Sequence, residues 1–174
     1  MAKRPTSQEF LVLDDSALLR QCELDTFRSS GPGGQKRNKT SSGVRLRHQL
    51  TGVIVTAVED RSQHVNKARA IRRLRAAIAL TVRHPLDDSY QPSELLRSCM
   101  NSQAHLIVGR RDERYPLAVA ELLDVLAAAG VKLSEAAKIV GIPTSHLVSF
   151  IENDPKLWQC VNQLRTAAGL KPLR

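Results

Sequence analysis

The spacing of apolar residues changes once along this chain of 174 residues, and that change restricts the fold more than any other feature. Up to about residue 60, short runs alternate apolar and polar residues, which is typical of half-buried strands. Glu23 to Arg28 is one such run and Gly43 to His48 is a second. A β-branched run from Val53 to Val58 follows a turn at residues 50–52. The pattern predicts a hairpin with a further strand beside it.

From Ser62 to about Val82 the apolar residues instead recur at helical spacing. Asp14-Asp15-Ser16 is a capping cluster for a short helix over residues 17–22, after a loose lead-in over residues 1–12. Residues 1–85 are therefore predicted to form an α+β domain in which a small sheet packs on a long helix. The apolar stripe expected on that helix comprises Val65, Ala68, Ile71, Leu74, Ile78 and Val82.

The second half of the chain is predicted to be an all-α domain over residues 93–174. Two prolines and several turn formers make residues 84–92 a predicted linker. Residues 106–109 fit either a strand or a buried loop. Helices are expected from Glu94 to about Asn101, from Pro116 to Ala129, from Ser134, from Pro143-Thr144, and from Pro155 to near Gly169.

Residues 134–152 have the spacing of a helix-turn-helix, with small and apolar residues where two helices would pack. A DNA-reading helix would offer Arg, Asn or Gln outward, but this segment offers Thr144, Ser145, His146 and Ser149. We therefore expect a packing or docking module, with His146 on the surface and Trp158 in the core. DNA is an unlikely partner, and a DNA-binding regulator is the alternative.

Positive charge is confined to the first half of the chain. Residues 1–85 hold 16 of the 26 Lys and Arg but 7 of the 17 Asp and Glu, so they carry the whole net charge of +9. This asymmetry favours a nucleic-acid-facing module joined to a neutral one. Three scattered cysteines suggest neither a disulfide framework nor a zinc site. No apolar run is long enough to span a bilayer and no secretory signal is visible, so a cytoplasmic location is expected.

The glycine-rich segment from Ser30 to Gln35 is the candidate for chemistry. Its glycines allow positive φ angles and a close approach to a partner, and they expose backbone N–H groups beside an amide side chain. Such donors can stabilise an oxyanion or orient water at an ester carbonyl. The chain lacks phosphate-loop, dinucleotide and serine-elbow motifs, so direct attack by water is the remaining route for hydrolysis. The other interpretation is a glycine-rich turn without chemistry. No metal and no cofactor are expected.

Two segments together carry a family resemblance. Residues 28–40, RSSGPGGQKRNKT, closely resemble the GGQ segment of class I peptide-chain release factors and their short relatives, and residues 61–68, RSQHVNKA, resemble the start of the long helix in that domain. The resemblance implies that the loop enters the ribosomal peptidyl-transferase centre and that Gln35 assists the attack of water on peptidyl-tRNA. Gly33 and Gly34 would allow its conformation. It also makes Gln35 a candidate for modification by a glutamine methyltransferase. The cations expected to contact ribosomal RNA are Arg28, Lys36, Arg37, Lys39, Arg45, Arg47 and Lys67.

The chain departs from this family in two ways. Arg37 stands where relatives usually carry an apolar residue, and residues 86–174 are neutral where stand-alone rescue hydrolases usually carry a basic tail. Some 20 residues precede the GGQ domain, which leaves no room for a codon-reading domain. The hypothesis is therefore a codon-independent peptidyl-tRNA hydrolase that rescues stalled ribosomes, in the bacterial cytosol. The alternative is a release-factor-like protein that binds ribosomes or RNA without hydrolysis.

Overall fold

The computed structural model describes residues 6–28, 41–87 and 89–174. Three strands and helices from both halves of the chain confirm the α+β class. The chain divides into two compact units, which we call the sheet unit (Glu9–Ile78) and the helical unit (Ala79–Arg174 with Met1–Gln8). None of the helices in the described residues has the length and apolar character needed to cross a membrane. The elements are α1 (Ser7–Leu11), α2 (Asp15–Arg20), β1 (Cys22–Phe27), β2 (Gly43–His48), β3 (Ile54–Ala57), α3 (Gln63–Thr81), α4 (Glu94–Ser98), α5 (Tyr115–Ala128), α6 (Leu133–Val140), α7 (Thr144–Glu152) and α8 (Pro155–Ala167).

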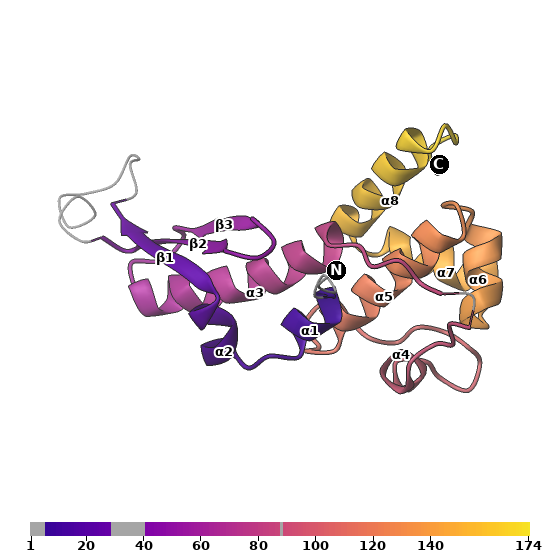
Figure 1. Ribbon diagram of the computed structural model, residues 1–174, viewed down its shortest axis with the longest axis horizontal. Coiled ribbons are helices and arrows are strands. Elements are labelled where there is room, and N and C mark those ends of the chain that lie inside the picture. Colours follow the sequence, from indigo (N-terminus) through magenta and orange to yellow (C-terminus); the bar gives the residue numbers. More distant parts are fainter. Residues whose placement is uncertain (1–5, 29–40, 88) are drawn as a thin grey trace. The chain divides into compact units, whose positions relative to one another are not determined.

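The sheet is antiparallel with the strand order β1-β2-β3, so β2 lies in the middle (Figure 1). Phe27 pairs with Gly43 at one end of the β1–β2 ladder and Cys22 with His48 at the other. Along β2, Val44 and Leu46 are completely buried whereas the intervening arginines are exposed. The alternation predicted for this strand is confirmed.

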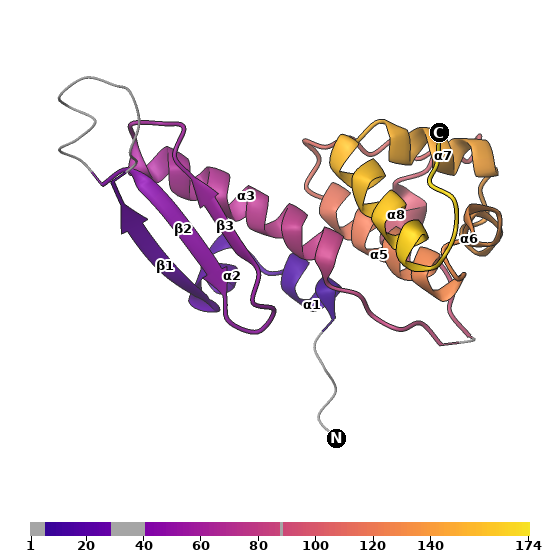
Figure 2. The same ribbon diagram turned by 90° about the horizontal axis from the view of Figure 1, so that it is seen from above.

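Helix α3 runs along the sheet in both views (Figures 1 and 2). It covers nearly the range predicted from the helical spacing. Its buried side is not quite the predicted stripe, because Ala68 is exposed and Val65 and Val82 are only half-buried. The buried side instead begins at Asn66, which has no exposed surface. The buried apolar residues of α3 are Ala70, Ile71, Leu74, Ile78 and Ala79.

From residue 6 onward the segment before the sheet is structured, which corrects the prediction of a loose lead-in for the residues that the structure describes. It forms α1, whose Phe10 and Leu11 are buried. The Arg75 guanidinium donates to the carbonyl oxygens of Leu11 and Leu13 at 2.8 and 2.6 Å, which fixes the connection from α1 to α2. The capping cluster is confirmed, because Asp14 accepts from the Ala17 amide. The helix it caps is α2, which ends before β1 begins at Cys22.

Helix α5 is the most buried element of the helical unit, with every residue from Leu117 to Leu126 buried. Two of these residues are acidic, and both bind the segment that leads from α3 to α4. Glu121 accepts from the Tyr90 hydroxyl and from the Ser93 amide, and Asp124 accepts from the His84 amide. The described residues of the predicted linker, 84–92, therefore contain no helix or strand but are held on α5. The division into domains over residues 1–85 and 93–174 stays a prediction.

The helix-turn-helix-like core is formed by α6 and α7. Gly141 ends α6 with φ +79°, and the residues predicted to pack between the two helices are buried. Two side-chain predictions were wrong. His146 is half-buried and stacks on His105 with ring centroids 3.4 Å apart, and Trp158 is half-buried rather than enclosed. The two rings stack because α7 presents His146 to the loop around His105. In this loop the Ala104 carbonyl oxygen lies within hydrogen-bond distance of His146 Nδ1.

Candidate active site

The three residues predicted to be catalytic, Gly33, Gly34 and Gln35, lie outside the described residues, as do Lys36, Arg37 and Lys39. What the structure describes is the part of the chain on either side of residues 29–40, which we call the base. This base is formed by the end of β1, the start of β2 and the first turn of α3, and Figure 2 shows these three at the same end of the sheet. Arg28, another predicted RNA contact, is exposed directly after β1.

The two strands approach each other closely at this base. A Cβ atom on Gly43 would lie 3.0 Å from the Phe27 carbonyl oxygen and 3.0 Å from its ring. A glycine therefore fits here for lack of space, since a side chain would require Phe27 to shift by a few tenths of an ångström. Two residues along β2 from Gly43, the Arg45 guanidinium lies 5.3 Å from the centre of the Phe27 ring, within the range of a cation–π contact.

Within this base, Asn66 links the first turn of α3 to Ser42, the residue before β2. Its Oδ1 accepts from the Asp60 amide at 3.0 Å, and its Nδ2 donates to the carbonyl oxygens of Asp60 at 2.8 Å and Ser42 at 2.7 Å. Asn66 is completely buried and Ser42 nearly so. Sequence reasoning missed Asn66, although it lies within the second motif. A polar residue inside an otherwise buried helix face is the signal that could have indicated it.

The predicted RNA contacts on β2 face solvent beside carboxylates of β1. Arg45 lies 3.8 Å from Asp25, and Arg47 lies 3.7 Å from Glu23. All four side chains are at least half exposed. Exposed pairs of this kind contribute roughly 0–1 kcal/mol, because water and salt screen them and ordering the side chains costs entropy. These arginines can therefore exchange their carboxylates for another anion at little cost.

On α3 the cations differ in how they are held. Arg73 binds Glu59 at 2.5 Å and also donates to the Thr56 carbonyl oxygen, so it fastens α3 to the end of β3. Its hydrogen bond lowers the pKa of the Glu59 carboxyl below its ordinary value. Arg69 lies 3.6 Å from Asp60. Lys67, the remaining predicted contact, is half-buried one residue after Asn66, and no carboxylate of the described residues lies within 4 Å of its ammonium.

Among the titratable residues that the structure describes in the sheet unit, His48 is completely buried. Its ring nitrogens lie 2.8 Å from Thr51 Oγ1 and 3.1 Å from Gln21 Oε1, and its ring meets Phe10 edge-on. Burial lowers the pKa of His48, so the imidazole is held neutral. His48 lies at the other end of β2 from Gly43, which makes it a structural residue of the core.

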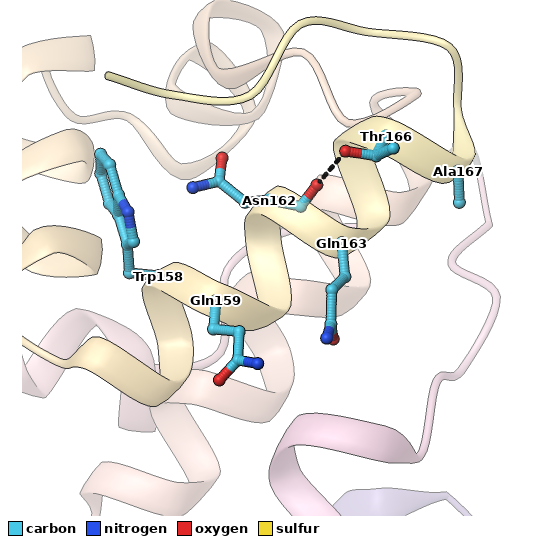
Figure 3. A pocket seen from close by; sticks show the side chains of 6 residues that line it. All are labelled: Trp158, Gln159, Asn162, Gln163, Thr166 and Ala167. Carbon is cyan, nitrogen blue, oxygen red and sulfur yellow. Dashed lines mark hydrogen bonds between the residues drawn. The ribbon is translucent and has the colours of Figure 1, made fainter.

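Two further features bear on ligand binding. In the part of the chain that the structure describes, no cluster of three His, Cys, Asp or Glu side chains could hold a metal ion. An open hollow lies along α8, and the side chains lining it all come from that helix (Figure 3). Gln159 and Gln163 on this surface are exposed amides. The lining residues are Trp158, Gln159, Asn162, Gln163, Thr166 and Ala167.

Comparison with known families identifies the domain that contains this base. The RF-1 domain matches residues 18–109, which is more than half of the chain. The chain belongs to the RF-1 domain family. The matched range covers the three strands, α3 and α4 together with both motifs noted in the sequence, and it ends before α5.

Several relatives of this RF-1 domain are themselves called release factors. The chain is 41% identical to peptide chain release factor 1 of Caldicellulosiruptor bescii over 92 residues, covering 53% of this chain and 24% of that protein. It is 37% identical to peptide chain release factor 1 of Syntrophobacter fumaroxidans over 114 residues, covering 66% and 29%. With peptide chain release factor 2 of Buchnera aphidicola it shares 45% identity over 71 residues, covering 38% and 19%. The chain thus spans less than a third of the length of these relatives.

Proposed function

We propose that this chain hydrolyses the ester bond of peptidyl-tRNA on the ribosome. The observation that carries the proposal is the RF-1 domain match, because it spans the Gly33-Gly34-Gln35 segment and both of its stems. The names of the relatives support it, since they are peptide chain release factors. The close-packed base formed by Phe27, Gly43 and Asn66 supports it as well, because a segment that acts within a larger partner needs a fixed point of attachment.

In this mechanism water is the nucleophile. Its oxygen attacks the carbonyl carbon of the peptidyl ester, the bond from that carbon to the ribose oxygen breaks, and a proton is transferred to the ribose oxygen. The products are a free peptide acid and a tRNA with a free hydroxyl group. Gln35 acts by orienting the water and by offering its N–H group to the developing oxyanion, and the two glycines give it room to do so. Gln35 is also the proposed target of a glutamine methyltransferase.

The finer form of the proposal is release without a stop codon, as in rescue of stalled ribosomes in the bacterial cytosol. Ribosomal RNA is the expected binding surface. The cations proposed to contact its phosphates are Arg28, Lys36, Arg37, Lys39, Arg45, Arg47 and Lys67. The exposure of Arg28, Arg45 and Arg47 in the structure supports part of this set. Whether release depends on a codon is decided by comparing ribosomes stalled on truncated mRNA with ribosomes that hold a stop codon or a sense codon.

The test of the reaction is release of labelled peptide from stalled ribosomes that carry peptidyl-tRNA. We expect Gln35→Ala to lower the release rate about 10²–10³-fold, the effect typical of losing an oxyanion donor, and Gly34→Ala to lower it as well. Gln163→Ala, which removes an exposed amide on α8, is the matched control and should leave the rate unchanged. The proposal is wrong if the unaltered protein releases no peptide or if Gln35→Ala matches it. Ribosome binding without release would instead indicate a non-hydrolytic binding protein.

A further inference from the structure

We infer that Asn66 is a positioning residue for peptidyl-tRNA hydrolysis, an inference that rests on the function proposed above. Its side-chain amide uses both N–H groups and its oxygen in hydrogen bonds to backbone atoms. One of these bonds reaches 24 residues back along the chain to Ser42, at the stem that follows residues 29–40. Asn66 therefore connects the start of α3 to the exit of the segment that carries Gln35 in the sequence.

The orientation of this amide is fixed by its surroundings. Asp60 presents both its N–H and its carbonyl oxygen to Asn66, so the side chain binds this residue through two hydrogen bonds. Rotation of the amide by half a turn would place Oδ1 against two carbonyl oxygens and Nδ2 against an N–H group. Because the Asn66 side chain is fully buried, water is poorly placed to compensate for such a mismatch. The Ser42 carbonyl is thus held in one place and direction.

The backbone of Asp60 is itself held near the beginning of α3. The Asp60 carboxylate accepts from the backbone N–H of Ser62 at 3.0 Å, and the Ser62 carbonyl oxygen accepts from the backbone N–H of Asn66 at 3.1 Å. A closed loop of hydrogen bonds therefore runs from Asp60 through Ser62 and Asn66 and back to Asp60. Through its Nδ2, Asn66 connects this turn to the Ser42 carbonyl oxygen. On the opposite stem, Phe27 packs against Gly43.

The consequence for the reaction follows from geometry. Hydrolysis needs the Gln35 amide, the water and the ester to be positioned relative to one another with a precision of a few tenths of an ångström. A misplacement of 1 Å typically costs about 100-fold in rate. Asn66 contacts none of the reacting atoms, since it is enclosed within the sheet unit. Its loss is expected to lower kcat while leaving KM, which reflects ribosome binding by the exposed cations, nearly unchanged.

The deciding variant is Asn66→Asp in the full chain. It keeps the shape and the bond from the Asp60 amide but places an oxygen against the carbonyl oxygens of Ser42 and Asp60. We expect kcat for peptide release to fall roughly 10–100-fold, with KM within about two-fold of the unaltered protein. Asn66→Ala should behave in the same way. Asn101→Asp is the matched control: Asn101 accepts from two backbone amides in the helical unit, and its exchange should change neither constant.

A second measurement separates this inference from the proposed function. Amide hydrogen exchange at Gly43 should become faster in both Asn66 variants, and exchange at Asp60 faster in Asn66→Ala, with the helical unit unchanged. All assays are run below the lowest melting temperature. Folded Asn66 variants with unaltered kcat or unaltered exchange at Gly43 would overturn the positioning role, and failure of both to fold would assign Asn66 to the core alone. If the unaltered protein releases no peptide but exchange responds as stated, the proposed reaction fails while the contact itself stands.

Discussion

In the sheet unit, the arginines of β2 stand exposed beside carboxylates of β1, whereas in the helical unit Glu121 and Asp124 are at most 6% exposed. The buried carboxylates hold the segment between α3 and α4, and Arg83 lies 3.2 Å from Asp124. Burial raises the pKa of Asp124 although Arg83 acts against this. The difference shows which of these charges build the fold and which remain available: Glu121 and Asp124 hold a segment of the helical unit, while Arg45 and Arg47 stay on the surface of the sheet unit.

The largest effect is expected where a buried carboxylate is removed. Glu121 accepts from Tyr90 Oη at 2.5 Å, Ser93 N at 2.8 Å and Ser93 Oγ at 2.6 Å. Glu121→Ala should lower the free energy of unfolding by about 2–4 kcal/mol, because these donors lose their acceptor in a buried site. Urea unfolding measures this. Glu121→Gln, which keeps one acceptor oxygen, should cost less.

The control is Glu135→Ala, which removes the exposed partner of Lys138 on α6. It should change the free energy of unfolding by no more than about 0.5 kcal/mol. Equal stability of the Glu121 and Glu135 variants would show that the buried carboxylate contributes no more to the fold than an exposed one.

A smaller effect, dependent on pH, is expected from His48 in the sheet unit. Its pKa in the folded state is lowered by burial, while an unfolded histidine titrates near 6.5. Protonation therefore favours the unfolded state. The stabilisation is complete above about pH 6.5 and is lost as the pH falls toward the lowered pKa of the folded protein, at no more than about 1.4 kcal/mol per pH unit.

Thermal unfolding of the full chain at pH 7.5 and pH 5.5 checks this. The unaltered protein should lose more stability across the interval than His48→Gln, which cannot titrate at this position. Equal losses in the two proteins would show that His48 does not contribute to the pH dependence of stability.

The smallest effect on stability is expected on the outer face of the sheet. Arg45→Ala and Arg47→Ala should each change the free energy of unfolding by less than about 1 kcal/mol, because both ion pairs are exposed. Their effect should appear in ribosome binding instead. Each variant should weaken binding and reduce the slope of log affinity against log salt by about one.

Lys138→Ala is the matched control, since Lys138 forms an exposed ion pair in the helical unit. Its salt dependence should equal that of the unaltered protein. Unchanged slopes in both arginine variants would remove Arg45 and Arg47 from the proposed RNA contacts.

Much of the fold follows from patterns along the sequence. Alternation in β2 predicts which side chains face inward, and the change to helical spacing predicts α3 almost to its ends. The misses are of one kind. Asn66, His48 and Glu121 are polar residues on faces that periodicity marks as buried, but the partners that allow their burial lie far away in the sequence and leave no sign in the hydropathy. Helix α1 was missed for a related reason, because its order depends on Arg75 of α3.

The candidate site divides in the same way. The motifs predict the family, which is confirmed, and they predict the chemistry at Gln35, which stays a prediction because it lies outside the described residues. The base of that segment could not be predicted in detail. The close approach at Gly43 and the bond from Asn66 to Ser42 arise only when the strands and α3 have come together.

The register of β1 and β2 gives the sheet a built-in competitor for anions. Because Asp25 stands opposite Arg45 and Glu23 opposite Arg47, a phosphate that binds this face competes with a carboxylate attached to the same molecule. A single phosphate replaces one weak contact with another and gains little. A surface that presents several phosphates at once displaces both carboxylates together and gains from each exchange. For the proposed RNA contact, the pairing would set a threshold of anion density for binding. Isolated anions would bind weakly, whereas a densely charged RNA surface would be bound.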